Sequence, residues 1–228
     1  MNEDLKNYGD KLVYFVIFNL AWFILIDFDL KLFVENYELL TIILSTSIFY
    51  FPIYIINNYI NADWKFILLY PLKYNHRYAS DIFTKIKTGK LKVKNELIDM
   101  KLIIKKYGYK KDPKFEDNLW FKLYLKHRYD SKIYQQHRQF LFCRDLTALM
   151  LPLSIFLIAL DYFITISITD RIWAVIVILI IEFFIVRGLA IKQNEKFALS
   201  VLQEETTNLK RKPDKNRISN KSKYITNW

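Results

Sequence analysis

Two apolar runs separated by a short polar turn occupy residues 146–191, LTALMLPLSIFLIALDYFITISITDRIWAVIVILIIEFFIVRGLAI. A helix rises about 1.5 Å per residue and therefore needs roughly 20 apolar residues to cross a hydrocarbon core of about 30 Å. Each run has that length. The pattern therefore predicts two membrane-spanning helices, at residues 146–168 and 172–191, joined by a tight turn.

Two further apolar runs precede this pair. Residues 39–60 carry no formal charge and are long enough to span, with Pro52 as the expected site of a kink. Residues 12–26 form a shorter run that is followed by Asp27. A short span is expected there, either completed by Phe28 and Leu30 or in a locally thinned bilayer. A buried or re-entrant helix is the alternative for this first run. The fold predicted from these four runs is an all-α, four-span transmembrane bundle.

Charge in the loops predicts the orientation, because cytoplasmic loops retain Lys and Arg. Residues 61–145 hold 20 Lys and Arg against nine Asp and Glu, and residues 187–228 hold ten against four. The connection at residues 27–38 holds one Lys against four acids. Both basic segments are therefore expected in the cytoplasm, together with both termini, in a multi-pass protein of the bacterial inner membrane.

The predicted domains follow the alternation of apolar and basic segments. They are a first transmembrane hairpin (1–60), a basic cytoplasmic helical domain between spans two and three (61–145), a second transmembrane hairpin (146–191), a cytoplasmic extension of the last helix (192–209) and a disordered basic tail (210–228). With only four Gly and five Pro in 228 residues, the chain favours long helices.

Several local signals predict helix boundaries in the basic domain. Asp81 can cap a helix that begins at residue 82, Asp112-Pro113 opens another helix, and Gly108 is an expected C-cap. From about Ser131 the chain is expected to run into the third span as one continuous helix, and the fourth span is expected to continue through residues 192–209. Two stripes of apolar residues are predicted to face the core: Leu97, Met100, Ile104 and Tyr107, and then Trp120, Leu123, Tyr124 and His127.

Four polar residues lie within the predicted spans, and the clearest is Glu182, near the centre of the fourth. A carboxylate there costs at least about 2.5 kcal/mol unless it is protonated, paired or hydrated. It either faces a pore, polar pathway or subunit interface, or is a protonated group hydrogen-bonded inside the bundle. Asn19 is a candidate pore-lining amide, with helix packing as the alternative. Asp161 is expected to reach the exterior headgroups. Arg187 is expected to snorkel to the cytoplasmic interface or to pair with Glu182.

Basic side chains gather in residues 101–111 and at the entry to the third span. Anionic lipid headgroups attract such segments by about 1 kcal/mol per charge, and a nucleotide, a nucleic acid or an acidic cytoplasmic protein is attracted in the same way. The candidate residues for binding an anion or partner are Lys101, Lys105, Lys106, Lys110, Lys111, Arg138 and Arg144.

Catalytic and metal-binding patterns do not stand out. Cys143 is the only cysteine, which excludes a disulfide-stapled domain, and the three His residues are too widely spaced to indicate a metal site. No nucleophile elbow, paired-carboxylate arrangement or Gly-rich phosphate loop accompanies them. The expected protein is therefore not an enzyme and uses no metal or cofactor.

Two segments carry a resemblance to uncharacterised bacterial multi-span proteins: HRQFLFCRDLTALMLPL (137–153) and RGLAIKQNEKFALSVLQEE (187–205). The residues that carry it are Arg138, Phe142, Arg144, Phe197, Ala198, Val201 and Leu202. The overall plan is also similar to small four-span accessory or effector proteins of bacterial phage-defence systems, including the partner of some RNA-targeting CRISPR nucleases. That resemblance implies a homo-oligomer that perturbs the membrane or forms a pore in antiviral defence.

Two functions are therefore expected. The first is an oligomeric pore or membrane-perturbing effector gated through the basic domain by an anionic signal. The second is a non-conducting membrane tether whose basic domain recruits a soluble partner. Both place anionic lipid headgroups beside the basic domain.

Overall fold

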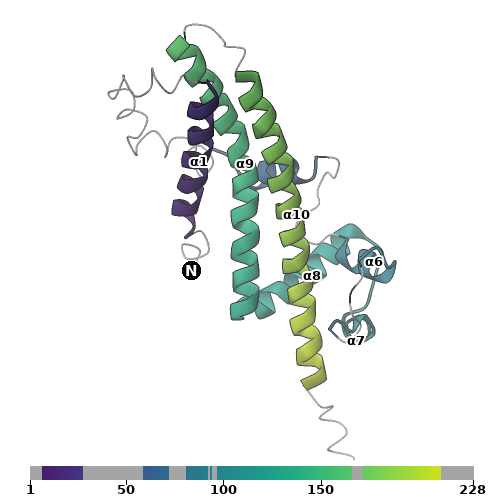
Figure 1. The fold of residues 1–228 in the computed structure, drawn as a ribbon. Coiled ribbons are helices and arrows are strands. Elements are labelled where there is room, and N and C mark those ends of the chain that lie inside the picture. The colour runs from purple at the N-terminus through teal and green to yellow at the C-terminus, as the bar shows by residue number, and fades with distance from the viewer. Residues whose placement is uncertain are drawn as a thin grey trace, which may run out of the picture. The chain divides into compact units, whose positions relative to one another are not determined.

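The computed structural model describes residues 7–27, 59–71, 81–91, 93, 97–165 and 172–211. These residues form seven helices and no strand, so the predicted all-α class is confirmed for this part of the chain (Figure 1). In chain order the helices are α1 (Gly9–Asp27), α5 (Ala62–Leu69), α6 (Ile82–Lys87), α7 (Met100–Tyr107), α8 (Pro113–His127), α9 (Ser131–Thr165) and α10 (Ile172–Arg211).

The two longest helices run through the predicted third and fourth spans. Helix α9 has 35 residues and α10 has 40, which correspond to lengths of about 52 and 60 Å. Both predicted continuations are confirmed, because α9 begins at Ser131 and α10 extends beyond residue 209. Each helix is therefore longer than a bilayer crossing requires.

By length and composition, two of the described helices can cross a membrane, over Ser131–Ala159 and Ile172–Arg211. The count of four spans stays a prediction. Helix α1 covers the first predicted run at residues 12–26. Residues 39–58 of the second predicted run, which was expected at 39–60, lie outside the described residues. The predicted turn at residues 169–171 and most of the tail at residues 210–228 lie outside them as well.

The contacts divide the chain into two compact units. One comprises Met1–Asn75 and His137–Gln193, and the other comprises His76–Gln136 and Asn194–Trp228. Helix α5 therefore belongs with the apolar helices, although the sequence placed everything from residue 61 in the basic domain. We refer to them as the membrane unit and the basic unit.

In the membrane unit, α1, α9 and α10 lie side by side (Figure 1). The buried side chains recur at helical spacing on each of the three helices, as expected for a packed bundle. They include Leu12, Val16, Leu20 and Phe23 on α1, Leu149, Leu153 and Leu157 on α9, and Val175, Leu179 and Ala190 on α10.

The basic unit packs its short helices around the C-terminal part of α10. Trp120 is 1% exposed, lies 5.2 Å from the ring centroid of Phe197, and donates its indole N–H to the carbonyl of Ala198 over 3.2 Å. Glu116, also on α8, accepts the backbone N–H of Thr84 over 3.1 Å and so fixes the start of α6. Of the predicted stripe on α8, Trp120, Leu123 and His127 are buried, and Tyr124 is half-buried with its ring against Trp120 and Phe197.

Helix α7 shows where sequence periodicity failed. Its predicted stripe began at Leu97, but the helix starts at Met100, where Asp99 accepts the backbone N–H of Leu102. Leu97 is 47% exposed, whereas Ile103 is fully buried, so the predicted face is wrong. The N-cap at Asp99 sets the register. The predicted C-cap is confirmed at Gly108, whose φ of 76° suits a residue without a Cβ.

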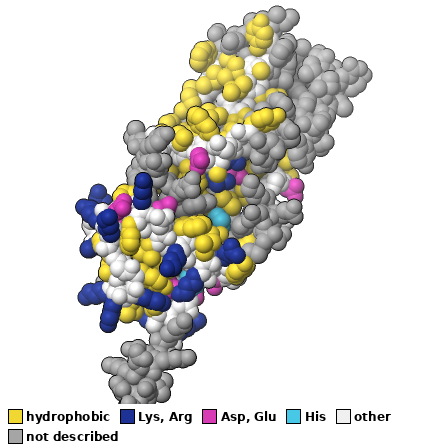
Figure 2. Space-filling model, turned by 180° about the vertical axis from the view of Figure 1, so that it is seen from behind, with side chains coloured by type: hydrophobic (Ala, Val, Ile, Leu, Met, Phe, Trp, Pro, Cys, Tyr) yellow, Lys and Arg dark blue, Asp and Glu magenta, His cyan; other side chains and the backbone are white. Residues whose placement is uncertain are grey.

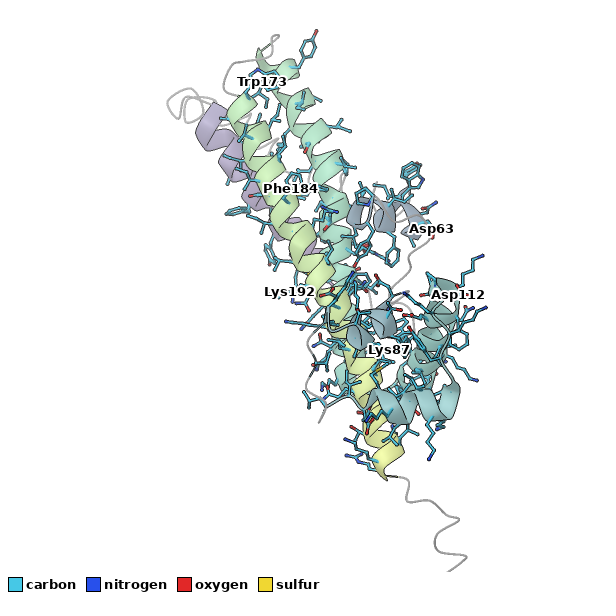
Figure 3. All side chains as sticks on the ribbon, turned by 90° about the vertical axis from the view of Figure 1, so that its right-hand side faces the viewer. Asp63, Lys87, Asp112, Trp173, Phe184 and Lys192 are labelled. Atoms are coloured by element: carbon cyan, nitrogen blue, oxygen red, sulfur yellow. The ribbon has the colours of Figure 1, made fainter. Side chains whose placement is uncertain are left out.

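The two units expose different kinds of side chain. Figure 2 shows hydrophobic side chains gathered in one region of the described surface, and most of the Lys and Arg side chains in another region, where they alternate with hydrophobic and other side chains. Trp173 and Phe184 on α10, labelled in Figure 3, are 62% and 61% exposed. Of the most apolar 18-residue stretch of α10, only 22% is buried within the chain. This apolar surface is far more continuous than scattered surface residues would produce.

Candidate functional site

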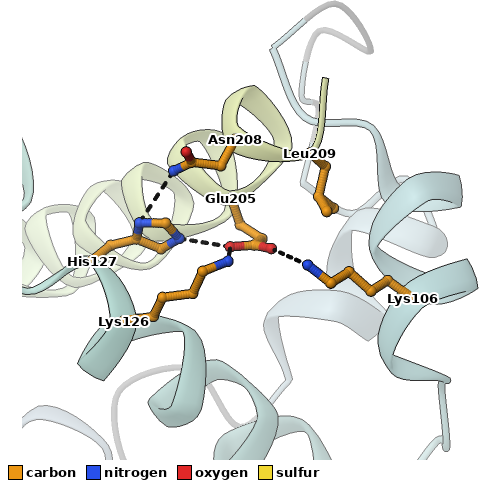
Figure 4. Close-up of a pocket in the computed structure, with 6 residues that line it drawn as sticks. All are labelled: Lys106, Lys126, His127, Glu205, Asn208 and Leu209. Atoms are coloured by element: carbon orange, nitrogen blue, oxygen red, sulfur yellow. Dashed lines mark hydrogen bonds and ion pairs between the residues drawn. The ribbon is translucent and has the colours of Figure 1, made fainter. Parts of the chain in front are cut away.

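A fully buried carboxylate organises the most polar cluster of the basic unit. Glu205 of α10 has no exposed side-chain surface and receives donors from two other helices (Figure 4). Tyr107 donates its hydroxyl proton to Oε1 over 2.7 Å, and Lys106 Nζ lies 3.5 Å from the same oxygen. At Oε2, His127 Nε2 lies at 2.6 Å and Lys126 forms an ion pair. Two donors on each oxygen satisfy the carboxylate completely.

Local sequence signals bring these donors to one place. Lys106 and Tyr107 occupy the last turn of α7, directly before its Gly108 cap. Lys126 and His127 occupy the last turn of α8, which begins at the Asp112-Pro113 cap. Helix C-termini stabilise cations, which favours basic residues in the last turns of α7 and α8. There these residues lie close enough to Glu205 to pair with its carboxylate. The cluster is therefore assembled from two helix ends and one continuous helix.

The cluster changes the acidity of its carboxyl group. Burial alone would raise the pKa of Glu205, but the hydrogen bonds from Lys126, His127 and Tyr107 outweigh it and lower the pKa to about 2. Asn208 Nδ2 lies 3.5 Å from His127 Nδ1. With its ring proton on Nε2, His127 donates to Glu205, and Nδ1 can accept from the Asn208 amide. Glu205 is consequently a permanent anion at physiological pH.

A small cavity opens beside the carboxylate. It has a volume of about 240 Å³ and is lined by Lys106, Lys126, His127, Glu205, Asn208 and Leu209. The side chains of the two lysines are 42% and 40% exposed, and each ammonium has three N–H donors, of which one faces Glu205. With one carboxylate against two ammonium groups, the wall keeps a net positive charge. The cavity can therefore accept a small anion or one phosphate group of a larger partner.

The predicted basic residues divide between this cavity and the open surface. Lys106 lines the cavity, whereas Lys101, Lys105, Lys110 and Lys111 are exposed and do not line it. The two predicted arginines belong to the membrane unit, where Arg138 donates to the backbone oxygen of Asn7.

Arg144 lies in a buried ion network of the membrane unit. It is 4% exposed, and its Nε donates to Asp145 Oδ1 over 3.0 Å. Lys65 Nζ lies 3.2 Å from the same oxygen, and the hydroxyl of Tyr8 donates to Oδ2 over 2.6 Å. This network joins α1, α5 and α9. Its geometry gives Arg144 a structural role, because the side chain has little surface left for a partner.

Two of the polar residues predicted within the spans come together. The Asn19 amide on α1 donates to the carbonyl of Phe15 over 3.1 Å and lies near enough to Glu182 of α10 to interact with it electrostatically, while Glu182 Oε2 is buried without a hydrogen-bond partner among the described residues. Asn19 is 2% exposed. The two side chains therefore meet between two helices of a single chain, and the hydrogen-bonded alternative for Glu182 stays a prediction.

The remaining two predicted span residues are placed differently. Arg187 donates its Nε proton to the carbonyl oxygen of Leu69 over 3.1 Å, at the C-terminal end of α5. A cation at a helix C-terminus is favourable because the last carbonyls lack intrahelical donors. Asp161 belongs to α9, and its side chain lies outside the described part of the chain.

Sequence reasoning missed the central residue of the cluster, although a signal for it was present. Asn194, Ala198, Val201 and Glu205 recur at steps of four, three and four, and all four are buried. A carboxylate on such a stripe indicates a buried, paired group. Its partners come from helices about 80 and 100 residues earlier in the chain. Among the described residues, no group of three or more His, Cys, Asp and Glu is placed to hold a metal ion.

No family model, no curated protein and no solved structure matches the chain. The resemblance of residues 137–153 and 187–205 to bacterial multi-span proteins therefore stays a prediction. The function is argued from the residues themselves.

Proposed function

We propose that this chain is a non-enzymatic integral protein of the bacterial inner membrane that holds a basic domain at the cytoplasmic surface and captures an anionic partner with it. The single observation that carries the proposal is the cavity beside Glu205, where ammonium groups from α7 and α8 converge around a buried carboxylate. The protein then works as a membrane tether with a defined anion site.

The membrane part of the proposal rests on exposed apolar surface. Helices α9 and α10 present large hydrophobic side chains outward over the residues of the predicted third and fourth spans, and lipid is the solvent that accepts such a surface. The side chains that carry the argument are Leu151, Ile155, Trp173, Val177, Ile181, Phe184, Ile185 and Leu189. Four crossings with cytoplasmic termini complete the proposed topology.

The anionic partner is inferred from the charge balance of the basic unit. The residues of this unit, 76–136 and 194–228, hold 24 Lys and Arg against 11 Asp and Glu, an excess of 13 positive charges. Two acids of the basic unit, Glu116 and Glu205, are buried, and each accepts hydrogen bonds from donors inside the unit. The surface is consequently more positive than the composition alone indicates, and it attracts phosphate-bearing or acidic partners.

Isothermal titration calorimetry on the full-length protein in detergent tests the anion site, with inorganic tripolyphosphate as the probe. Replacing both Lys106 and Lys126 by Gln removes two charge-assisted hydrogen bonds, worth roughly 1.5–3 kcal/mol each, so the affinity is expected to fall by at least about tenfold. Lys105 and Lys110 are the matched control pair, because their replacement by Gln changes the net charge equally outside the cavity. An equal loss in both pairs, or no binding by the unaltered protein, overturns the proposed site.

A homo-oligomeric pore is the competing proposal. It needs polar groups that face an aqueous path, whereas Asn19 is 2% exposed and donates to the carbonyl of Phe15 within its own helix. Planar-bilayer recordings of the reconstituted protein, with and without tripolyphosphate, separate the two functions. Ligand-dependent conductance that is lost in Glu182→Gln favours the pore, and binding without ion flux favours the tether.

A further inference from the structure

Helix α5 is apolar on two opposite faces. Its buried face consists of Phe66 and Leu69 together with Lys65, whose charge is paired with Asp145. On the opposite face Trp64 is 61% exposed and Ile67 is 42% exposed, three residues apart and thus side by side on the helix surface. Asp63 is exposed one turn from Ile67. The outer face of α5 therefore carries large apolar side chains next to a charge, which is the character of a helix that lies in a membrane interface.

Three contacts fix α5 against α9 and α10 within the membrane unit (Figure 3). Lys65 pairs with Asp145 over 3.2 Å, the rings of Phe66 and Phe140 lie 5.9 Å apart, and the carbonyl of Leu69 accepts the Nε proton of Arg187 over 3.1 Å.

These contacts set the level of α5 relative to the predicted spans. Asp145 immediately precedes the third span at residues 146–168, and Arg187 lies about one turn before the end of the fourth span at residues 172–191. Both positions mark the cytoplasmic ends of those spans. Helix α5 therefore lies at the level of the cytoplasmic headgroups, a step that rests on the membrane crossing proposed above.

The length and the ends of α5 suit that level. Its eight residues extend about 12 Å, far short of a crossing of about 30 Å. Asn61 accepts the backbone N–H of Trp64 over 2.9 Å at one end, and Arg187 satisfies a carbonyl at the other. Trp is enriched at this boundary because its ring is apolar and its indole N–H can bond to headgroups.

We propose that α5 is an interfacial helix that inserts Trp64 and Ile67 into the boundary between headgroups and acyl chains of the cytoplasmic leaflet. The occupant of its outer face is lipid. The exposed apolar surface of α9 and α10 continues the same lipid contact in the membrane unit, and insertion of about 5–10 Å is typical of such a helix. The helix then fixes the depth of the membrane unit through its contacts with Asp145 and Arg187.

Site-specific fluorescence in vesicles of phosphatidylcholine and phosphatidylglycerol tests this inference. In a Cys143→Ala background, an environment-sensitive dye is attached at one introduced cysteine: Ile67→Cys on α5, Val177→Cys on α10, or Asn118→Cys on the exposed face of α8. Quenching is measured with aqueous iodide and with lipids brominated either near the glycerol or deep in the acyl chain. The dye at position 67 is expected to be quenched more by shallow than by deep bromine and to lose most iodide quenching relative to position 118.

The three labelled sites separate the ways in which the inference can fail. Quenching by deep bromine at position 177 together with free iodide access at position 67 overturns the interfacial helix and leaves the membrane crossing intact. Shielding of position 67 from both quenchers also overturns it and identifies a second copy or another protein segment as the occupant. Iodide access at position 177 overturns the membrane crossing itself.

Discussion

The carboxylate of Glu205 stabilises the basic unit, and Glu205→Gln is expected to weaken it by about 2–3 kcal/mol. The pKa of this group falls from a reference of 4.5 to about 2, which corresponds to about 3 kcal/mol of favourable interaction for the ionised form. Lys106 and Lys126 are 42% and 40% exposed and regain water when the charge is removed, whereas the His127 side chain is only 7% exposed and regains little. The expected loss of stability is therefore equal to, or slightly below, this favourable interaction of about 3 kcal/mol.

Hydrogen–deuterium exchange of the full-length protein in detergent measures this effect locally. Amides of α7 and α8 report the free energy of opening of the basic unit, so a loss of 2–3 kcal/mol raises their exchange rates by roughly 30- to 150-fold. Glu204→Gln is the matched control, since Glu204 is the preceding residue and is only half-buried. If Glu205→Gln and Glu204→Gln changed the opening free energy of α8 by the same amount, the central role of Glu205 would be refuted.

Three further predictions concern acid, the buried ion network and the polar pair within the spans. Because the pKa of Glu205 is lower in the folded state, the stability that its carboxylate contributes is fully present above about pH 4.5 and is lost as the pH falls toward 2. Hydrogen exchange of α8 should show this loss in acid, and Glu205→Gln should abolish the pH dependence. Asp145→Asn leaves a buried Lys and a buried Arg without their carboxylate and should cost about 3–5 kcal/mol, seen as a lower melting temperature in detergent than for the exposed control Asp10→Asn. Asn19→Leu removes the buried amide beside Glu182 and should cost about 0.6–1.7 kcal/mol in the same assay, whereas a gain of stability would show that the two polar side chains do not hold the helices together.

The long helices were predictable because their signals are local. Uninterrupted apolar sequence, followed by residues that favour helix, predicted the course of α9 and α10 through and beyond the spans. The cap at Asp112-Pro113 and the C-cap at Gly108 were equally local and are confirmed. The start of α7 was not, because the three-residue spacing of Leu97 and Met100 imitates a helical stripe, whereas the side chain of Asp99 caps the helix at Met100.

The candidate site could be predicted only in part, because its geometry depends on contacts between distant segments. Lys106 was identified from the density of basic residues, but nothing nearby in the sequence separates it from Lys105 or Lys110. Only the fold brings Lys106 to Glu205, 99 residues away. In the same way, Arg144 appeared to be a binding residue until Asp145, Lys65 and Tyr8 gave it buried partners.

Helix α5 was assigned to the basic domain for a similar reason. Its sequence contains Asp63 and Lys65. Judged by charge alone, such a helix is expected to be exposed in the cytoplasm. The pairing of Lys65 with Asp145 buries that lysine and attaches the helix to the membrane unit. Lys65 can therefore be buried in the membrane unit because Asp145 neutralises its charge there.

The central claim, that apolar helices hold a basic domain on the cytoplasmic side of a membrane, is tested most directly by cysteine labelling with a membrane-impermeant maleimide. The reporter is Lys110→Cys in a Cys143→Ala background, because Lys110 is exposed in the basic unit and Cys143 is the only native cysteine. Labelling is expected in inside-out membrane vesicles and not in right-side-out vesicles or intact cells. Labelling in intact cells, or release of the protein from the vesicles by alkaline carbonate, would contradict the account.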